Sequence, residues 1–163
     1  MVLAVIADTH MPRGRRRLPD ECVERVREAD LVLHAGDFVA ASVLSELEAL
    51  GPPVAAVRGN LDDAELRRRL PEARVVEADG ARIGMVHDAG PRGGRLARMR
   101  RRFPDVGSVV FGHSHIPLHE AEGPFQIFNP GSQTDRRRQP RHTMGLARVD
   151  GAGKVAFEHV TLD

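Results

Sequence analysis

The first half of the chain alternates short apolar runs with helical patterns, and this alternation narrows the possible folds sharply. Residues 2–7 (VLAVIA), 31–34 and 54–57 are mostly apolar and of strand length, as in strands buried on both faces of a sheet. Helical patterns follow these runs at residues 19–29, 40–50 and 63–70. Prolines and a glycine stand near their expected ends. The pattern predicts strands and helices that alternate along the chain.

The second half contains mostly strand patterns. A hairpin is expected from residues 74–78 and 82–87, which flank the turn pair Asp79-Gly80. One helix is expected at residues 94–102. Five further strands are expected at residues 108–111, 117–122, 125–128, 143–149 and 155–161. Together the two halves predict an α/β (α+β) fold, a two-sheet β-sandwich flanked by helices, built as a single domain over residues 1–163.

Composition excludes several classes of protein. The chain carries 24 basic and 23 acidic side chains, so no strong overall field draws it to nucleic acid or membrane. Trp and Tyr are absent, which removes the usual platforms for stacking bases. The single cysteine, Cys22, excludes an internal disulfide and a cysteine-cluster metal site. No apolar run approaches the roughly 20 residues that span a bilayer, and we expect a cytoplasmic protein with no membrane contact.

Polar side chains of metal-ligand type follow the predicted strands, at the points where the strands end. They are Asp8, His10, Asp37, Asn60, His87, His113 and His115. Folds of this class gather their sites at strand ends because rigid strands deliver loops to one edge of a sheet. Imidazole, carboxylate and amide donors suit Mn, Fe, Ni or Zn better than Ca or Mg, which prefer shells made of oxygen. We expect Mn first among these metals.

Seven ligand groups are too many for one metal ion and fit two ions that share a ligand. One aspartate can bridge two ions that lie roughly 4 Å apart, and a hydroxide held between them has a pKa far below that of bulk water. Two cations also neutralise the charge of a phosphate during an in-line displacement. The residue set therefore indicates hydrolysis of a phosphoester by a metal-bridging hydroxide.

The same residues belong to an ordered series of short motifs. From the N-terminus these are Asp8-Thr9-His10, Gly36-Asp37, Gly59-Asn60, His87, Gly112-His113-Ser114-His115 and Asn129-Pro130-Gly131-Ser132. The series resembles the calcineurin-like metallophosphoesterases, and especially the small single-domain phosphodiesterases of bacteria and archaea. Each motif alone is weak, whereas the ordered set at strand ends is a strong signal.

The resemblance implies a role for each of these residues. The ligands of one divalent ion would be Asp8, His10 and His115, and those of a second would be Asn60, His87 and His113. Asp37 would bridge the two ions, and Asn60 would also stabilise charge on the phosphate. The turn at residues 129–132 would support the site without binding metal. The implied fold is the family's two-sheet sandwich flanked by helices.

Two positions depart from the family pattern. Many larger members carry a histidine directly after the metal-binding asparagine, where it is thought to assist the leaving group, and this chain has Leu61. Leucine cannot move a proton, a loss that typically costs roughly 10²–10⁴-fold in rate when the leaving group is poor. Asp88 stands where glycine is expected. Its carboxylate would either support His87 or add negative charge near the substrate.

Other polar residues carry weaker signals. Asp62 would orient a metal-bound water or a nearby histidine, or cap the helix that begins near residue 63. Arg13 and Arg136 lie in arginine-rich loops beside the motifs and are candidate substrate-binding residues, since Arg binds phosphate bidentately. His34 is expected in the core or behind the ligands. The remaining histidines are expected on the surface: His119, His142 and His159.

The sequence therefore predicts a dinuclear metal-dependent phosphodiesterase that acts on a small phosphodiester. One alternative is a non-catalytic protein-binding scaffold of the same fold, similar to a eukaryotic retromer subunit. Others are a nuclease or cyclic-nucleotide phosphodiesterase, and a phosphomonoesterase of small metabolites. The filled ligand set argues against the scaffold, and the neutral charge and missing Trp and Tyr argue against nucleic acid. The oligomeric state stays open.

Overall fold

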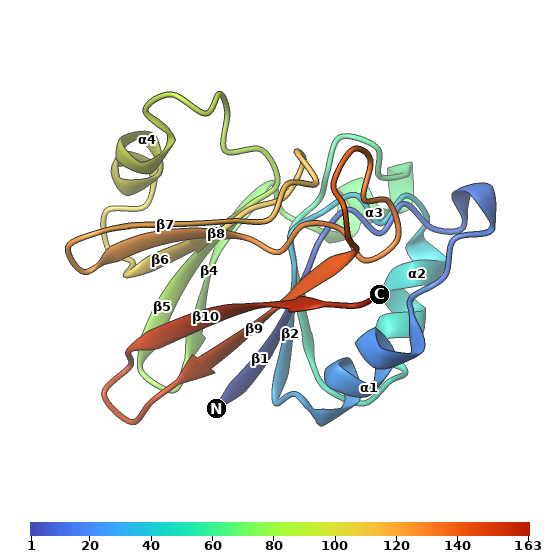
Figure 1. The fold of residues 1–163 in the computed structure, drawn as a ribbon, viewed down its shortest axis with the longest axis horizontal. Coiled ribbons are helices and arrows are strands. Elements are labelled where there is room, and N and C mark those ends of the chain that lie inside the picture. The colour runs from blue at the N-terminus through green and yellow to red at the C-terminus, as the bar shows by residue number, and fades with distance from the viewer.

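The first sheet brings together strands from both ends of the chain (Figure 1). The computed structural model describes residues 1–163, and the strand order in this sheet is β10-β9-β1-β2-β3. Strand β1 is parallel to β2 and antiparallel to β9. The strands are β1 Val2–Ile6, β2 Leu31–His34, β3 Val54–Ala56, β9 Thr143–Val149 and β10 Val155–Thr161. All five strands were predicted from the sequence.

The second sheet also has five strands, in the order β4-β5-β6-β8-β7. Its strands are β4 Ala73–Ala78, β5 Ala81–Val86, β6 Ser108–Val110, β7 Leu118–Glu122 and β8 Phe125–Asn129. The predicted hairpin is confirmed, since β4 and β5 pair antiparallel across Asp79 and Gly80. Both turn residues have a positive φ, 47° and 82°, which matches the two-residue turns that suit the twist of a hairpin.

The helices lie on the outer faces of the two sheets (Figure 1). They are the 3₁₀ turn η1 Arg13–Arg15 and the α-helices α1 Asp20–Glu28, α2 Ala41–Glu48, α3 Ala64–Arg69 and α4 Arg95–Arg102. The turn η1 lies in a segment where the sequence indicated only a basic loop, and Gly14, with φ 60°, permits its tight backbone. None of these helices is both long enough and apolar enough to cross a membrane.

The apolar core is divided into layers by the sheets. Leu3 and Val5 of β1 belong to a cluster of 17 buried residues that draws on both sheets. Ala4 and Ile6, on the other face of the same strand, belong to a cluster of 16 residues with the inner sides of α1 and α2. Because side chains alternate along a strand, one apolar run serves two layers of core. The predicted two-sheet sandwich flanked by helices is thereby confirmed.

Parallel pairing brings the ends of successive strands to one place. Ile6 of β1 lies beside His34 of β2, which lies beside Ala56 of β3, so the loops after these strands leave the sheet together. In the second sheet, Met85 of β5 lies beside Val110 of β6. All predicted metal ligands lie in the loops that follow these five strands. The rigid strands therefore deliver them to a common edge.

Cys22 lies on the inner side of α1 and is completely buried. Burial raises the pKa of its thiol to about 12. A thiol with so high a pKa stays protonated at neutral pH and is a poor nucleophile. The residue is thus part of the core.

Candidate metal centre

The predicted ligands adopt an unusual backbone conformation. The φ angles are 54° at Asp8, 45° at His10, 60° at Asp37, 69° at His113 and 59° at His115. Left-handed conformations of residues other than glycine cost about 1–3 kcal/mol each and persist only where the surrounding structure enforces them. Their concentration in one cluster is typical of a functional site.

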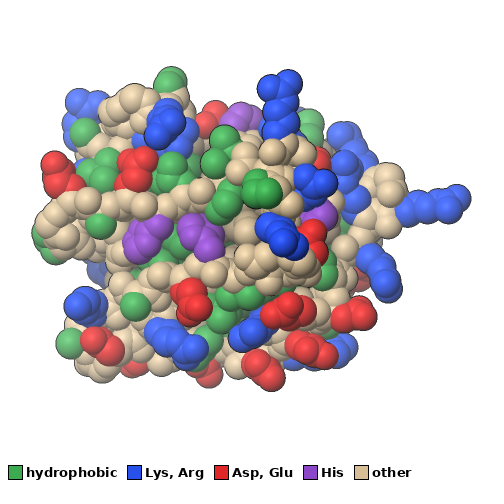
Figure 2. Space-filling model, viewed as in Figure 1, with side chains coloured by type: hydrophobic (Ala, Val, Ile, Leu, Met, Phe, Trp, Pro, Cys, Tyr) green, Lys and Arg blue, Asp and Glu red, His purple; other side chains and the backbone are tan.

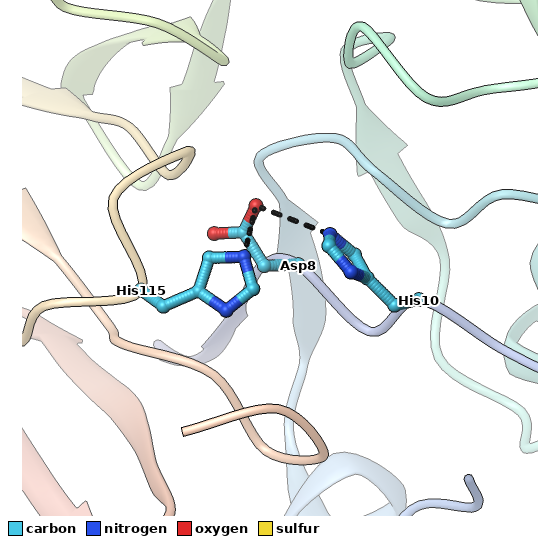
Figure 3. Close-up of side chains that lie close together, drawn as sticks. All are labelled: Asp8, His10 and His115. Carbon is cyan, nitrogen blue, oxygen red and sulfur yellow. Dashed lines mark ion pairs between the residues drawn. The ribbon is translucent and has the colours of Figure 1, made fainter. Parts of the chain in front are cut away.

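The carboxylate of Asp8 lies between the imidazoles of His10 and His115 (Figure 3). Asp8 Oδ1 is 4.0 Å from His10 Nε2 and 3.6 Å from His115 Nε2, and all three side chains are buried. His115 donates a hydrogen bond from Nδ1 to the carbonyl oxygen of Asp135, so its Nε2 carries a lone pair. This Nε2 and Asp8 Oδ2 are buried without a hydrogen-bond partner. A metal cation bound between them would satisfy both atoms.

Asn60, His87 and His113 form a second cluster. Asn60 Oδ1 lies 3.1 Å from His87 Nε2 and 3.1 Å from His113 Nδ1, and these two ring nitrogens are 3.3 Å apart. His87 donates from Nδ1 to the carbonyl oxygen of Ala35 at 2.7 Å, which leaves Nε2 directed at the cluster. In contrast to the first cluster this one is open to solvent, since the His113 side chain is 47% exposed.

Asp37 connects the two clusters. Its Oδ2 lies 3.2 Å from His10 Nε2 and 3.4 Å from His87 Nε2. The other oxygen, Oδ1, accepts a hydrogen bond from the Leu61 N–H at 2.8 Å. One carboxylate oxygen therefore contacts a predicted ligand from each cluster, which is the position that a bridging ligand needs. Asp37 also has a donor atom within 4.8 Å of donor atoms of both Asp8 and His87.

Burial and charge shift the pKa values of these groups. Burial raises the pKa of the Asp8 carboxyl to about 7. Burial opposes the charged form of His87, but the hydrogen bond with Asp37 and the charge of Asp8 outweigh it and raise its pKa to about 9. Burial also opposes ionisation of Asp37, yet hydrogen bonds from His10 and His87 hold its pKa well below the usual range. Burial lowers the pKa of His115 to about 4 and keeps it neutral, the form that binds metal.

The turn at residues 129–132 holds the ligand loops in place. Asn129 donates from Nδ2 to the carbonyl oxygen of Gly112 at 2.9 Å, directly before His113. Ser132 donates from Oγ to the carbonyl oxygen of Asp8 at 2.8 Å. Both side chains bind backbone atoms of the ligand loops. This is the supporting arrangement that the resemblance implied.

Sequence reasoning missed Asp135 and Arg16. Asp135 Oδ2 lies 3.4 Å from His10 Nδ1, and the Asp135 carbonyl oxygen accepts from His115 Nδ1. One residue therefore orients the outer nitrogens of two predicted ligands. Arg16 NH2 lies 3.3 Å from Asp135 Oδ2. The only signal in the sequence was that Asp135 follows Ser132, the last residue of the last motif, by three positions.

His34 lies behind the ligands. It is completely buried and stacks on Phe38 with ring centroids 3.5 Å apart. The Gly36 N–H donates to its Nδ1 at 3.1 Å, so Nε2 carries the proton and donates to Thr9 Oγ1 at 3.2 Å. Burial lowers its pKa to about 3 and keeps the ring neutral. His34 thus links the loop after β1 to the loop after β2, the placement that the sequence indicated.

Asp62 neither orients a histidine nor caps a helix. Its Oδ1 accepts from the Val39 N–H at 2.8 Å and its Oδ2 from the Gly59 N–H at 2.7 Å. The side chain therefore braces the loop between β3 and α3. Its neighbour Asp63 is the cap of α3, since its Oδ1 accepts from the Leu66 N–H at 2.9 Å. The helix cap expected at Asp62 lies at Asp63 instead, because the backbone N–H groups of Val39 and Gly59 bind the Asp62 carboxylate. The expected role of Asp62 toward a metal-bound water stays a prediction.

Asp88 does not support His87. Its Oδ1 accepts from the Gly90 N–H at 2.7 Å, and its Oδ2 lies 3.9 Å from His113 Nε2. The side chain is 57% exposed. It therefore places negative charge at the open side of the second cluster, which is the second of the two roles expected for it.

The two arginines expected to contact phosphate lie on exposed loops. Arg136 donates to the carbonyl oxygen of Gln139 at 2.6 Å, within its own loop. Arg13 lies on η1, between β1 and α1, and basic side chains project outward from that side of the molecule (Figure 2). Neither arginine has a hydrogen bond or ion pair to a predicted ligand. Arg16 is the loop arginine that reaches the centre, through Asp135.

The other histidines divide into two kinds. His142 and His119 lie toward the surface, where His142 Nδ1 is 3.0 Å from Asp163 Oδ2. His159 was expected there as well, but it is half-buried, stacks on Phe128 at 4.4 Å and donates to the carbonyl oxygen of Asn129 at 2.8 Å. Histidine side chains gather on the face where β7 and β10 lie (Figure 2). The apolar face of Phe128 explains why His159 packs inward.

Proteins of known family resemble the chain over most of its length. The sequence profile of the calcineurin-like phosphoesterase superfamily domain matches residues 1–152. A probable metallophosphoesterase of Methanothermobacter thermautotrophicus is 34% identical over 154 residues, which cover 93% of this chain and 87% of that protein. A phosphodiesterase of Methanocaldococcus jannaschii is 27% identical over 147 residues, which cover 80% and 83%.

Solved structures agree on the fold. Vps29 of Entamoeba histolytica, determined in complex with Zn²⁺, superposes with a TM-score of 0.79 at 24% identity, and both chains are covered in full. This likeness concerns the fold alone, whereas the profile match and the archaeal metallophosphoesterase concern the sequence. The chain therefore belongs to the calcineurin-like phosphoesterase superfamily.

Proposed function

We propose that the chain is a phosphodiesterase that uses two divalent metal ions, with Mn²⁺ as the expected metal. The observation that carries the proposal is the pair of buried acceptor atoms, Asp8 Oδ2 and His115 Nε2, that have no hydrogen-bond partner. Asp37 Oδ2 lies near both clusters, which suits two ions that share a carboxylate. The relative from M. jannaschii is named a phosphodiesterase, which supports the reaction class.

When bound, the ions would act as Lewis acids on the phosphate and lower the pKa of a water molecule. The residues of the chain hold and orient the reacting groups. Asp8, His10 and His115 offer a buried ligand set, and Asp37 links it to the second set. Because Asn60 and His113 are exposed, the substrate approaches from their side. Asn60 Oδ1 faces the histidines, so its Nδ2 is the atom that donates to a phosphate oxygen.

The chain places no general acid beside Asn60 that could protonate the leaving group. Leu61 follows Asn60 and has no proton to donate, and the nearest exposed imidazole, His113, belongs to the ligand set. The Asp88 carboxylate already accepts a hydrogen bond from the Gly90 N–H and offers no proton. We therefore expect esters of acidic alcohols such as phenols to react faster than esters of ordinary alcohols.

The test is hydrolysis of bis(p-nitrophenyl) phosphate by metal-stripped protein, before and after Mn²⁺ is added. Turnover should require the metal and should fall by roughly 10³-fold or more in Asp37→Asn, since loss of the shared ligand removes several kcal/mol of charge stabilisation. Asp105→Asn is the matched control, because Asp105 is exposed between α4 and β6. Full activity without metal, or in Asp37→Asn, would overturn the proposal.

The same assay decides between the alternatives. p-Nitrophenyl phosphate, cyclic nucleotides and an oligonucleotide, each tested beside the diester, distinguish a monoesterase and a nuclease from a phosphodiesterase of small molecules. Metal binding with no turnover of any of these esters would favour a protein-binding scaffold. The metal series Mn²⁺, Fe²⁺, Ni²⁺ and Zn²⁺ identifies the preferred ion.

A further inference from the structure

A cavity of about 280 Å³ lies beside the exposed half of the metal centre. Its lining includes the second set of predicted ligands: Asn60, His87 and His113. The same cavity is lined by Arg58 from the loop after β3, Glu72 from the segment before β4, and Arg102 from the end of α4. The cavity thus connects the predicted reaction site to two guanidinium groups.

The two arginines share a single carboxylate. Arg58 NH2 lies 3.6 Å from Glu72 Oε2, and Arg102 NH2 lies 3.2 Å from Glu72 Oε1. The Glu72 side chain is 68% exposed, and ion pairs this exposed are worth at most about 1 kcal/mol each. A stronger anion can therefore displace Glu72. Its carboxylate demonstrates that an anionic group fits between the two guanidinium groups.

Most hydrogen-bond donors of the two arginines remain free. Each guanidinium has five N–H donors in a fixed fork. Arg58 uses NH1 on the carbonyl oxygen of Arg67, at a distance of 3.4 Å. Arg102 has the ring of Phe103 at 5.9 Å beside its guanidinium carbon. The free donors suit a tetrahedral anion such as phosphate, which Arg binds bidentately.

The rest of the lining excludes other ligand chemistries. Val86 is its one hydrophobic residue, and no Phe lines it, so neither a nucleobase nor a lipid chain gains much there. Asp88 also lines the cavity, but it lies on the side of His113, where bound metal ions would dominate the local charge. The favourable position for a second anion is therefore between Arg58 and Arg102.

We propose that Arg58 and Arg102 bind a second phosphate of the substrate, carried by a group esterified to the phosphate that is hydrolysed. This inference rests on the proposed function and names its substrate class: phosphodiesters that bear an additional phosphate. Glu72 occupies this position in the free protein and is displaced when that phosphate binds.

Two chromogenic substrates that differ by one phosphate provide the test. They are thymidine 5′-(p-nitrophenyl phosphate) with and without a 3′-phosphate, hydrolysed by the Mn²⁺-loaded protein. The 3′-phosphate should lower KM about tenfold, which corresponds to about 1.4 kcal/mol. Arg102→Gln should abolish this difference while kcat and the KM of the simpler substrate stay unchanged. Arg101→Gln, the matched control from the same exposed end of α4, should retain it.

Glu72→Gln separates phosphate binding from a structural role of the ion pairs. Removing the competing carboxylate should lower KM for the 3′-phosphorylated substrate by about threefold, within the worth of an exposed ion pair. If the ion pairs only joined α4 to the segment before β4, the same variant would leave KM unchanged or raise it. Equal KM values for the two substrates in the wild-type protein would overturn the proposal.

A binding measurement without metal or turnover distinguishes this proposal from the proposed function. Inorganic phosphate is titrated into the metal-free protein and the arginine Nε–H signals are followed by ¹⁵N NMR. The signals lost in Arg58→Gln and Arg102→Gln should be the ones that shift. If they shift but neither ester is hydrolysed, the proposed function fails and the phosphate site stands. If both esters are hydrolysed with one KM and no signal shifts, the phosphate site is refuted alone.

Discussion

Replacing Gly59 with alanine should disrupt the proposed metal centre without altering a predicted ligand. A Cβ atom on Gly59 would lie 2.1 Å from Asp37 Oδ1, 2.3 Å from Asp37 N and 2.7 Å from Asp37 Cγ. Comfortable contacts between non-bonded atoms lie at about 3.5 Å, so Asp37 would have to move by about 1 Å or more. The backbone conformation is no obstacle, because Gly59 is not among the residues with a positive φ.

That movement acts on the carboxylate between the two clusters. Asp37 Oδ2 lies 3.2 Å from His10 Nε2 and 3.4 Å from His87 Nε2, and ligand positions tolerate only about 0.2 Å. We expect Mn²⁺ affinity to fall by about 100-fold or more, at or beyond the upper end of what outer-sphere changes cost. Overpacking typically lowers the free energy of unfolding by about 1–3 kcal/mol. Because three atoms of one residue would be too close, we expect the loss in Gly59→Ala to lie at the upper end of this range.

Calorimetric titration with Mn²⁺ measures the affinity, and urea denaturation of the metal-free protein measures the free energy of unfolding. Gly107→Ala is the matched control, since a Cβ there would meet nothing within 4 Å and Gly107 has no positive φ. This control should bind metal normally and gain up to about 1 kcal/mol of stability from a less flexible unfolded chain. Wild-type affinity for two Mn²⁺ ions in Gly59→Ala would refute the steric argument.

The pKa shifts and hydrogen bonds of the site lead to three more expectations. The pKa is about 7 for Asp8 and about 9 for His87, so Mn²⁺ binding at pH 7 should release about one to two protons. The Mn²⁺ affinity should therefore rise with pH. A calorimetric binding enthalpy that is the same in buffers of different ionisation enthalpy would contradict this. Asp62→Ala should lower the free energy of unfolding, measured in urea, by about 3–6 kcal/mol, because two backbone N–H groups lose a charged acceptor. Asp62→Asn should lower it by about half as much. Equal losses in the two variants would contradict this explanation. His34 has a pKa lowered from 6.5 to about 3, so below pH 6.5 the unfolded chain binds a proton that the folded chain does not. Between pH 6.5 and pH 3, the free energy of unfolding should therefore fall by about 1.4 kcal/mol for each unit by which the pH is lowered, because of this group. The urea midpoint of His34→Gln should depend less steeply on pH.

The fold was readable from the sequence because its signals are local. The strands Leu31–His34 and Thr143–Val149 have the predicted bounds to the residue, since apolar composition and flanking turn residues mark both ends. The sequence also predicted that these ligands would lie close together, because parallel strands such as β1 and β2 place their ends side by side. In each case a short stretch of sequence carries the whole signal.

The hydrogen-bond and ion-pair partners of side chains could not be predicted, because they depend on contacts between segments that are distant in the sequence. Asp62 and Asp63 are adjacent and chemically identical, and the sequence does not indicate that Asp62 would meet the Val39 N–H from another loop. Likewise Asp135 contacts His10 across more than a hundred residues of chain. Arg58 and Arg102 share Glu72 only because α4 ends near the segment before β4. Such pairs depend on the packed structure.

The motif glycines are required for a steric reason that the sequence pattern alone does not show. A Cβ on Gly36, Gly59 or Gly112 would collide with a predicted ligand from a different motif. The closest such distances are 2.1 Å from Gly59 to Asp37 Oδ1, 2.8 Å from Gly36 to His87 Nδ1 and 2.9 Å from Gly112 to Asp8 Oδ2. These three motifs therefore each supply at least one predicted ligand and the space for another, so that their loops fit together only as a set. This interdependence explains why the ordered series of motifs is informative while each member alone is weak.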